Sequence, residues 1–85
     1  MNYTYILLCN DNTFYIGWTN DLEKRLRVHN EGKGARYTRG RRPVTLVYWE
    51  EHKSRSQAQK REIILRTLNR REKEILVENF EFKKT

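Results

Sequence analysis

Two short runs of aromatic and β-branched residues, separated by a polar cluster, restrict the fold of this chain more than any other feature. The runs cover residues 3–9 and 13–19, and the cluster between them, at residues 10–12, reads Asn-Asp-Asn. Aromatic and β-branched residues favour strands, whereas Asn and Asp favour tight turns. The pattern therefore predicts an antiparallel β-hairpin in which Cys9 faces Thr13.

This register also predicts which side chains share a face of the hairpin. Antiparallel partners keep a constant sum of residue numbers, so Tyr5 lies opposite Gly17 and Leu7 lies opposite Tyr15. Glycine has no side chain, which leaves a hollow beside the Tyr5 ring with Tyr15 diagonally across from it. The two phenols would line one shallow pocket, although ordinary strand packing explains the same pattern. The other face is apolar and is the expected core side: Ile6, Leu8, Phe14, Ile16 and Trp18.

The remainder of the chain predicts a helix, a third strand and two further helices. The helices are expected over residues 20–30, 54–68 and 69–80, and the strand over residues 44–49. Each helix begins with a capping-box pattern. The three pairs are Asn20 with Glu23, Ser54 with Gln57, and Asn69 with Glu72. The order β-β-α-β-α-α predicts an α+β fold, with a three-stranded antiparallel sheet flanked by helices.

The 85 residues leave room for one domain,. We expect this domain to cover residues 1–82, with residues 83–85 as a frayed tail. Cys9 is the only cysteine and is interpreted as a core residue rather than a reactive thiol,. No apolar stretch approaches the ~18 residues that a membrane span needs, so we expect a cytoplasmic protein without a membrane partner.

The charge of the chain points to a polyanionic partner. Lysine and arginine number 18 against 11 acidic residues, which gives a net charge of +7,. The segment 33–42 contains five of the positive charges and no acidic residue, so as a structural element it would repel itself. We interpret it as a loop that binds nucleic acid, with Tyr37 offering its ring to a base or sugar. The five basic residues are Lys33, Arg36, Arg39, Arg41 and Arg42.

Two positions on the predicted helices have the chemistry of a phosphate site. Arg25 and His29 are four residues apart, so they share a helix face and can present cationic donors, although a solvated face explains the pair as well. Glu62 lies at the edge of its helix's apolar stripe, four residues after Ala58 and three before Leu65. A carboxylate there either pairs with a neighbouring arginine or is held in place to bind a hard divalent cation.

These features together resemble the GIY-YIG nuclease superfamily over nearly the whole chain. The second of the two family motifs stands intact at residues 15–17, as Tyr-Ile-Gly. The first, at residues 3–5, reads Tyr-Thr-Tyr and keeps only the final tyrosine of Gly-Ile-Tyr. The run at residues 32–38 is similar to that of the small stand-alone bacterial members. In position, Arg25 matches the helix arginine of the family and Glu62 its metal-binding glutamate, and many members carry a histidine where this chain has His29.

The resemblance implies a metal-dependent endonuclease that hydrolyses phosphodiester bonds in DNA. Glu62 would hold one Mg²⁺ or Mn²⁺, and Arg25 would offset charge that grows on the phosphate. Tyr5 or Tyr15 would accept the proton of the attacking water, provided that nearby cations lower its pKa from about 10 toward neutrality. His29 would orient that phenol or share its role.

We expect a nucleic-acid partner, with DNA favoured over RNA. The basic loop offers phosphate contacts and hardly any element that reads a groove, so we expect little sequence preference and a substrate chosen by its structure. An unidentified protein partner would supply targeting. Two alternatives stay open at this point. One is a non-catalytic DNA- or RNA-binding module on the same scaffold, and the other is a basic adaptor that docks on an acidic protein.

Overall fold

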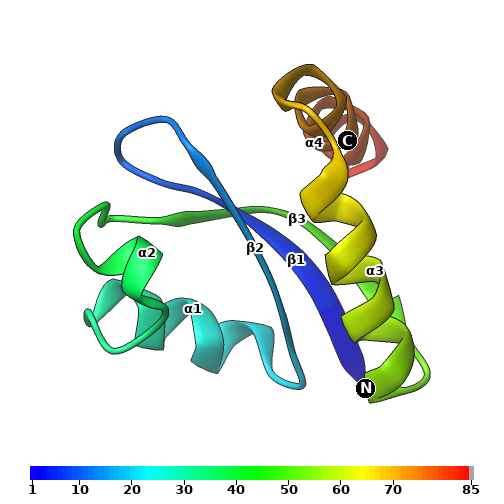
Figure 1. Ribbon diagram of the computed structural model, residues 1–85, viewed down its shortest axis with the longest axis horizontal. Coiled ribbons are helices and arrows are strands. Elements are labelled where there is room, and N and C mark those ends of the chain that lie inside the picture. Colours follow the sequence, from blue (N-terminus) through cyan, green and yellow to red (C-terminus); the bar gives the residue numbers. More distant parts are fainter. Residues whose placement is uncertain (85) are drawn as a thin grey trace.

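A three-stranded antiparallel sheet forms the centre of the protein (Figure 1). The computed structural model describes the backbone of residues 1–84 and the side chains of residues 1–80. The strands are β1 (Asn2–Leu8), β2 (Phe14–Thr19) and β3 (Thr45–His52), in the spatial order β2-β1-β3. The hairpin has the predicted register, with Tyr5 opposite Gly17 and Leu7 opposite Tyr15. The predicted fold class is therefore confirmed.

Four helices flank this sheet, with α1 and α2 on one side and α3 and α4 on the other (Figure 1). Their bounds are α1 (Leu22–Asn30), α2 (Arg36–Arg39), α3 (Arg55–Thr67) and α4 (Arg70–Lys84). The single turn of α2 lies inside the segment that was expected to be a loop. Helix α4 continues past its expected end near residue 80, and Thr85, at the end of the expected tail, lies outside the described residues.

Both faces of the sheet are buried, so the expectation of a one-sided core is wrong. On the expected core side, Ile6 and Ile16 pack against Leu65 of α3. On the tyrosine side, Tyr5 and Leu7 form a second cluster with Cys9 and Val44, and Leu22 and Leu26 of α1 pack against it. The apolar ridge of α1 covers a face that the hairpin pattern alone leaves open to solvent. The predicted core role of Cys9 is confirmed.

The helix caps follow the sequence pattern in two of three cases. Ser54 accepts a hydrogen bond from the backbone of Gln57, and Asn69 and Glu72 cap each other reciprocally at the start of α4. The expected Asn20 cap of α1 is wrong by one residue, because the carboxylate of Asp21 accepts from the backbone N–H of Lys24 at 3.1 Å.

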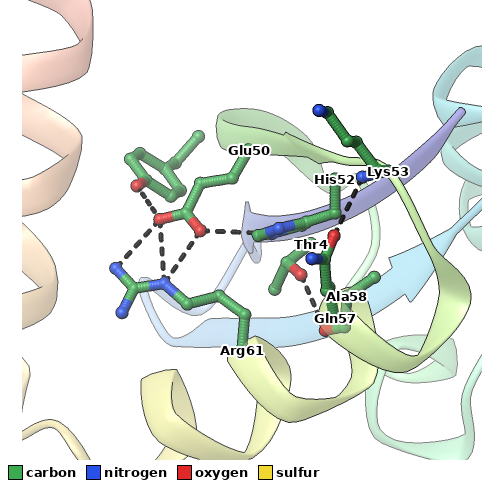
Figure 2. Close-up of polar contacts among 8 residues, drawn as sticks. Thr4, Glu50, His52, Lys53, Gln57, Ala58 and Arg61 are labelled. Carbon is green, nitrogen blue, oxygen red and sulfur yellow. Dashed lines mark hydrogen bonds and ion pairs between the residues drawn. The ribbon is translucent and has the colours of Figure 1, made fainter.

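A half-buried polar network holds α3 against β3 (Figure 2). Arg61 donates to both oxygens of Glu50, from Nε at 2.8 Å and from Nη2 at 2.9 Å, and the Tyr48 hydroxyl donates to the same carboxylate. Burial alone would raise the pKa of Glu50, but the hydrogen bonds from Arg61 and Tyr48 hold it below its usual value. The Thr4 hydroxyl adds a hydrogen bond from β1 to the Ala58 carbonyl at 2.8 Å. These contacts fix how α3 is rotated about its axis, which also sets the direction of its neighbouring side chains.

Among residues 1–84, no helix is both long enough and apolar enough to span a bilayer,.

The orientation of α3 predicts opposite outcomes for two neighbouring substitutions. Leu65 is fully buried whereas Ile64 is 51% exposed. We expect Leu65→Ala to lower the free energy of unfolding by about 2–5 kcal/mol, since it opens a cavity in the core. Ile64→Ala is the matched control and should change it by roughly 0.5 kcal/mol or less. Urea denaturation followed by circular dichroism measures both, and equal losses would contradict this orientation.

Candidate active site

The position of Gly17 allows two tyrosines to gather on one face of the hairpin. A Cβ atom at this position would lie 2.6 Å from the Tyr5 hydroxyl oxygen and 3.2 Å from the Tyr15 ring. Real Cβ atoms essentially never approach another atom as closely as 2.6 Å, so any other residue would displace the Tyr5 hydroxyl. The hollow expected beside the Tyr5 ring is therefore filled by that ring, which is only 2% exposed.

Tyr5 begins a chain of buried hydrogen bonds that joins β1, α1 and α2. Its hydroxyl lies 3.0 Å from Nε2 of His29, and Nδ1 of His29 lies 2.8 Å from the Thr38 hydroxyl. Thr38 in turn donates to the carbonyl of Ala35 at 2.9 Å. A carbonyl can only accept, so the Thr38 hydroxyl must receive its hydrogen bond from Nδ1–H. In neutral His29, Nε2 is then the acceptor, and Tyr5 donates to it.

Burial sets the protonation states of this pair. The pKa of His29 is lowered from 6.5 to about 4, chiefly by burial and in part by the nearby charge of Arg25. Burial also raises the pKa of Tyr5 from 10.0 to about 12, although a hydrogen bond from Arg25 opposes the change. The requirement that cations lower a tyrosine pKa toward neutrality is therefore not met at Tyr5, because burial outweighs Arg25. At neutral pH the pair consists of a phenol and a neutral imidazole.

Arg25 and His29 lie close to Tyr5 on the same side of the sheet. Their spacing in the sequence predicted a shared helix face but not which face of the sheet that helix covers. Arg25 is half-buried and borders Tyr5 together with the apolar residues Leu22 and Leu26. His29 is completely buried, so a solvated helix face does not explain this position. The loop that follows α1 approaches the imidazole closely at Gly34, where a Cβ atom would lie 2.4 Å from Nδ1.

Glu62 comes from the helix on the other side of the sheet and lies within electrostatic range of Tyr5. Its carboxylate, 17% exposed, is bonded through Oε2 to Nη2 of Arg66 at 2.9 Å. The same nitrogen donates to the backbone carbonyl of Ile16 at 3.2 Å. Because β2 is an edge strand, α3 can place Glu62 beside the strand that bears Tyr15,. The charge of Glu62 acts on Tyr5, where it contributes to the raised pKa.

The arginine pairing expected as one explanation of Glu62 is thus confirmed, and it leaves the second carboxylate oxygen free of partners in the described part of the chain. Residues 1–80 contain no group of three or more His, Cys, Asp and Glu side chains arranged to hold a metal ion. A lone carboxylate still fits Mg²⁺, which keeps several water ligands and uses one or two carboxylates together with substrate phosphates. Glu62 is the residue that would hold it.

The segment 33–42 is less free than its sequence suggested. Arg41 forms an ion pair with Asp11 at 2.8 Å, so the run does have an acidic partner, supplied by the turn between β1 and β2. Arg42 donates to the backbone carbonyls of Arg39 and Asn30. Across the described residues, the side chains of Lys33, Arg36 and Arg39 form no hydrogen bond or ion pair, so these three remain available for phosphate.

The ring of Tyr37 already contacts two neighbours. It stacks on Tyr15, with centroids 5.9 Å apart, and the Arg41 guanidinium lies 4.0 Å from its ring centroid. A base that stacked on Tyr37 would compete with these contacts, so the ring contact that the sequence suggested stays a prediction. The ring of Tyr15 also contacts His29, with centroids 5.3 Å apart. Tyr37 and Arg41 consequently hold Tyr15 against the buried histidine.

Sequence reasoning missed three participants in this site. The i,i+4 spacing of Glu62 and Arg66 is a signal that could have identified the ion pair. Thr38 leaves no such signal, because its pairing with His29 depends on how the loop folds back. The contact between Asp11 and Arg41 joins residues 30 positions apart and equally requires the tertiary structure.

Comparison with known proteins places these features in a family context. The model of the GIY-YIG catalytic domain matches residues 1–75. UPF0213 protein CPE1444 of Clostridium perfringens is 55% identical over 73 residues, which cover 86% of this chain and 78% of that protein. UPF0213 protein YazA of Bacillus subtilis is 43% identical over 77 residues, covering 91% of this chain and 78% of the relative.

Two solution NMR structures are similar to this fold. UPF0213 protein BH0048 from Bacillus halodurans is 46% identical, with a TM-score of 0.58 over 92% of this chain and 84% of that one. Protein EF2693 from E. faecalis is 41% identical, with a TM-score of 0.61 over 95% of this chain and 86% of that one. The names of these relatives state no activity.

The low pKa of His29 predicts a pH-dependent stability. Between about pH 4 and 6.5 the unfolded chain binds a proton that the folded protein excludes,. The resulting stabilisation is complete above pH 6.5 and is lost as the pH falls toward 4, by about 3 kcal/mol in total. Urea denaturation across this range, compared between the natural protein and His29→Gln, isolates this contribution from that of Glu50. Identical pH profiles would contradict the neutral, buried imidazole.

The contacts of Arg41 predict that it acts structurally. Arg39, whose side chain has no partner among the described residues, is predicted to contact phosphate. We expect Arg41→Gln to destabilise the fold by about 1–2 kcal/mol and to leave the salt dependence of nucleic-acid binding nearly unchanged. Arg39→Gln removes the same charge from the same segment. It should leave the free energy of unfolding unchanged and reduce the slope of log K for nucleic-acid binding against log [salt] by about 0.7–0.9. Thermal unfolding and fluorescence anisotropy at several salt concentrations test both variants, and the reverse pattern would refute these roles.

Proposed function

This chain belongs to the GIY-YIG family, and on that premise we propose that it is a metal-dependent endonuclease that hydrolyses phosphodiester bonds in DNA. The observation that carries the proposal is the buried pair of Tyr5 and His29, flanked by Arg25 and within electrostatic range of Glu62. A protein that only bound nucleic acid would have no need of a proton acceptor behind a phenol, or of an acidic side chain beside it.

The direction of the Tyr5–His29 hydrogen bond supplies a route for the proton of the attacking water. As the water oxygen forms its bond to phosphorus, the bond between phosphorus and the leaving oxygen breaks, and one water proton passes to the Tyr5 hydroxyl oxygen. The original hydroxyl proton of Tyr5 moves at the same time to Nε2 of His29, which becomes an imidazolium. Its Nδ1–H keeps the hydrogen bond to Thr38 throughout. We assign the first proton transfer to Tyr5 rather than Tyr15 because only Tyr5 has an acceptor behind its hydroxyl among the described residues.

The charge of Arg25 links substrate binding to the basicity of His29. Without substrate, burial and Arg25 together hold the pKa of His29 near 4, which makes it a weak base. A phosphate bound to Arg25 offsets the positive charge, so one of the two causes of the low pKa is removed. The imidazole then becomes a better proton acceptor in the substrate complex than in the free protein. Arg25 also stabilises the negative charge that grows on the phosphate during attack.

A Mg²⁺ or Mn²⁺ ion held by Glu62 would stabilise the phosphate and the leaving oxygen as a Lewis acid. Arg66 supports this role because it fixes the carboxylate through one oxygen and leaves the other available. Lys33, Arg36 and Arg39 would contact the backbone phosphates. Such contacts position a strand without reading its bases, so we expect the protein to select substrates by structure more than by sequence.

A cleavage assay with labelled branched and linear DNA tests the proposal in the presence of Mg²⁺, Mn²⁺ or EDTA. We expect cutting that requires metal and falls by about 10²–10⁴-fold in Tyr5→Phe, because the proton route is lost. Glu62→Gln and Arg25→Ala should each lower the rate by at least about 100-fold. Glu51→Gln, at an exposed carboxylate, is the control and should retain full activity.

Two outcomes would count against the enzyme. Tight, salt-dependent binding without cutting would identify the non-catalytic binding module instead. Cutting that survives in both Tyr5→Phe and Glu62→Gln would point to a contaminating nuclease.

A further inference from the structure

A hollow of about 330 Å³ lies along β2, beside the candidate active site but outside the catalytic roles assigned above. Its walls come from the β2 strand, the single turn of α2, and the end of α3 and start of α4. The residues that line it are Phe14, Tyr15, Ile16, Tyr37, Arg66 and Lys73. The lining thus contains two cations, two phenols and no carboxylate.

The two cations in this hollow have unused hydrogen-bonding capacity. Arg66 is 56% exposed and binds Glu62 and Ile16 through Nη2 alone, which leaves Nε and Nη1 without partners in the described residues. The ammonium group of Lys73 forms no hydrogen bond or ion pair with any side chain or backbone group described. Lys73 carries a charge that no described group neutralises, and it lines the same hollow as the free donor nitrogens of Arg66, whose own charge is paired with Glu62,. Their arrangement therefore favours a negatively charged ligand.

The walls of the hollow are held in place by contacts that do not involve the ligand. Arg70 donates to the backbone carbonyl of Asn12, and its guanidinium lies 4.5 Å from the centroid of the Phe14 ring. With the reciprocal cap of Asn69 and Glu72, these contacts dock the first turn of α4, and with it Lys73, against the hairpin. The opposite wall is fixed by the stack of Tyr37 on Tyr15. A site whose walls are already ordered loses little conformational entropy when it binds a ligand.

We propose that this hollow binds a phosphodiester group of the nucleic-acid strand, next to the phosphate that is cleaved. Arg66 contacts Glu62 directly. A phosphate bound to the free nitrogens of Arg66 would therefore lie beside the phosphate that is cleaved at Glu62. The strand would then cross the edge of β2, from the cations near α2 toward Lys73 on α4. Tyr15 and Tyr37 would meet it with their hydroxyl groups, since the ring of Tyr37 already contacts Tyr15 and Arg41. This subsite rests on the proposed function, because it takes the cleaved phosphate as its reference point.

The first test compares the binding of a fluorescent DNA oligonucleotide by the natural protein, Lys73→Gln and Lys60→Gln. Binding is measured in EDTA, so no cleavage interferes. Lys73→Gln should weaken binding 3- to 10-fold and reduce the slope of log K against log [salt] by about 0.7–0.9. Lys60 is an exposed lysine on α3 that lines a separate hollow together with His52 and Lys53, so its variant should bind like the natural protein. Equal effects of the two substitutions would overturn the subsite.

The second test locates the contact on the strand with oligonucleotides in which a single phosphate is replaced by a neutral methylphosphonate. In the natural protein, a methylphosphonate at one particular position should weaken binding. In Lys73→Gln, the same methylphosphonate should cause no further loss of affinity, because the lysine that contacts this phosphate is already gone. If the loss from the methylphosphonate and the loss from Lys73→Gln simply add, the contact is contradicted. The assignment to nucleic acid would also be overturned if Lys73→Gln weakened the binding of inorganic phosphate but not the binding of the oligonucleotide.

These measurements separate the subsite from the nuclease proposal. If the natural protein binds DNA through Lys73 but does not cut it, the nuclease proposal fails, and the hollow keeps its contact with a phosphodiester group but loses its place beside a cleaved phosphate. If it cuts DNA and Lys73→Gln binds and cuts like Lys60→Gln, the nuclease stands and the subsite is refuted. Thermal unfolding of Lys73→Gln should match that of the natural protein, because the side chain supports no described contact.

Discussion

The hydrogen bond between Tyr5 and His29 is the interaction on which the arrangement of the protein's tyrosine side depends. It joins β1 to α1, and the second nitrogen of His29 extends the connection to Thr38 in α2. All three side chains are almost completely buried, so loss of any one would leave a polar group without a partner, at a cost of about 1–3 kcal/mol,. The close approaches at Gly17 and Gly34 follow from this constraint, because each lets backbone lie where a side chain would displace the pair.

The strand order gives the small domain a way to combine groups from both layers. Tyrosines project from one face of the sheet and α3 covers the other, so a wider sheet would keep Glu62 away from Tyr5. Because β2 lies at the edge, Arg66 can bind its Ile16 carbonyl and hold Glu62 beside the strand. The same contact satisfies an acceptor on an otherwise open strand edge. The network of Glu50 and Arg61 contributes indirectly, since it fixes the rotation of the helix that bears Glu62.

The sequence was sufficient for features that depend on local periodicity. Alternation with a period of two determined the register of the hairpin and placed Tyr5 opposite Gly17,. It could not show that α1 covers the tyrosine face, and this one omission has two consequences. The core was expected on a single side, which is wrong, and the condition set for a tyrosine base, a lowered pKa, is not met at Tyr5, because burial raises its pKa to about 12. Contacts that join distant segments, such as Asp11 with Arg41, depend equally on packing that no local pattern contains.

The cationic side chains of the chain fall into two groups, those that bind other groups within the fold and those with free donors. Several arginines are engaged internally: Arg41 with Asp11, Arg61 with Glu50, Arg42 and Arg70 with backbone carbonyls. A guanidinium whose donors are already bound in the fold has fewer left for phosphate, although its charge still contributes to the field around the protein. The net charge of +7 therefore overstates the number of direct phosphate contacts. Direct contacts fall to cations with free donor groups, and on this basis Lys73, outside the basic segment, ranks with Lys33, Arg36 and Arg39 and ahead of Arg41.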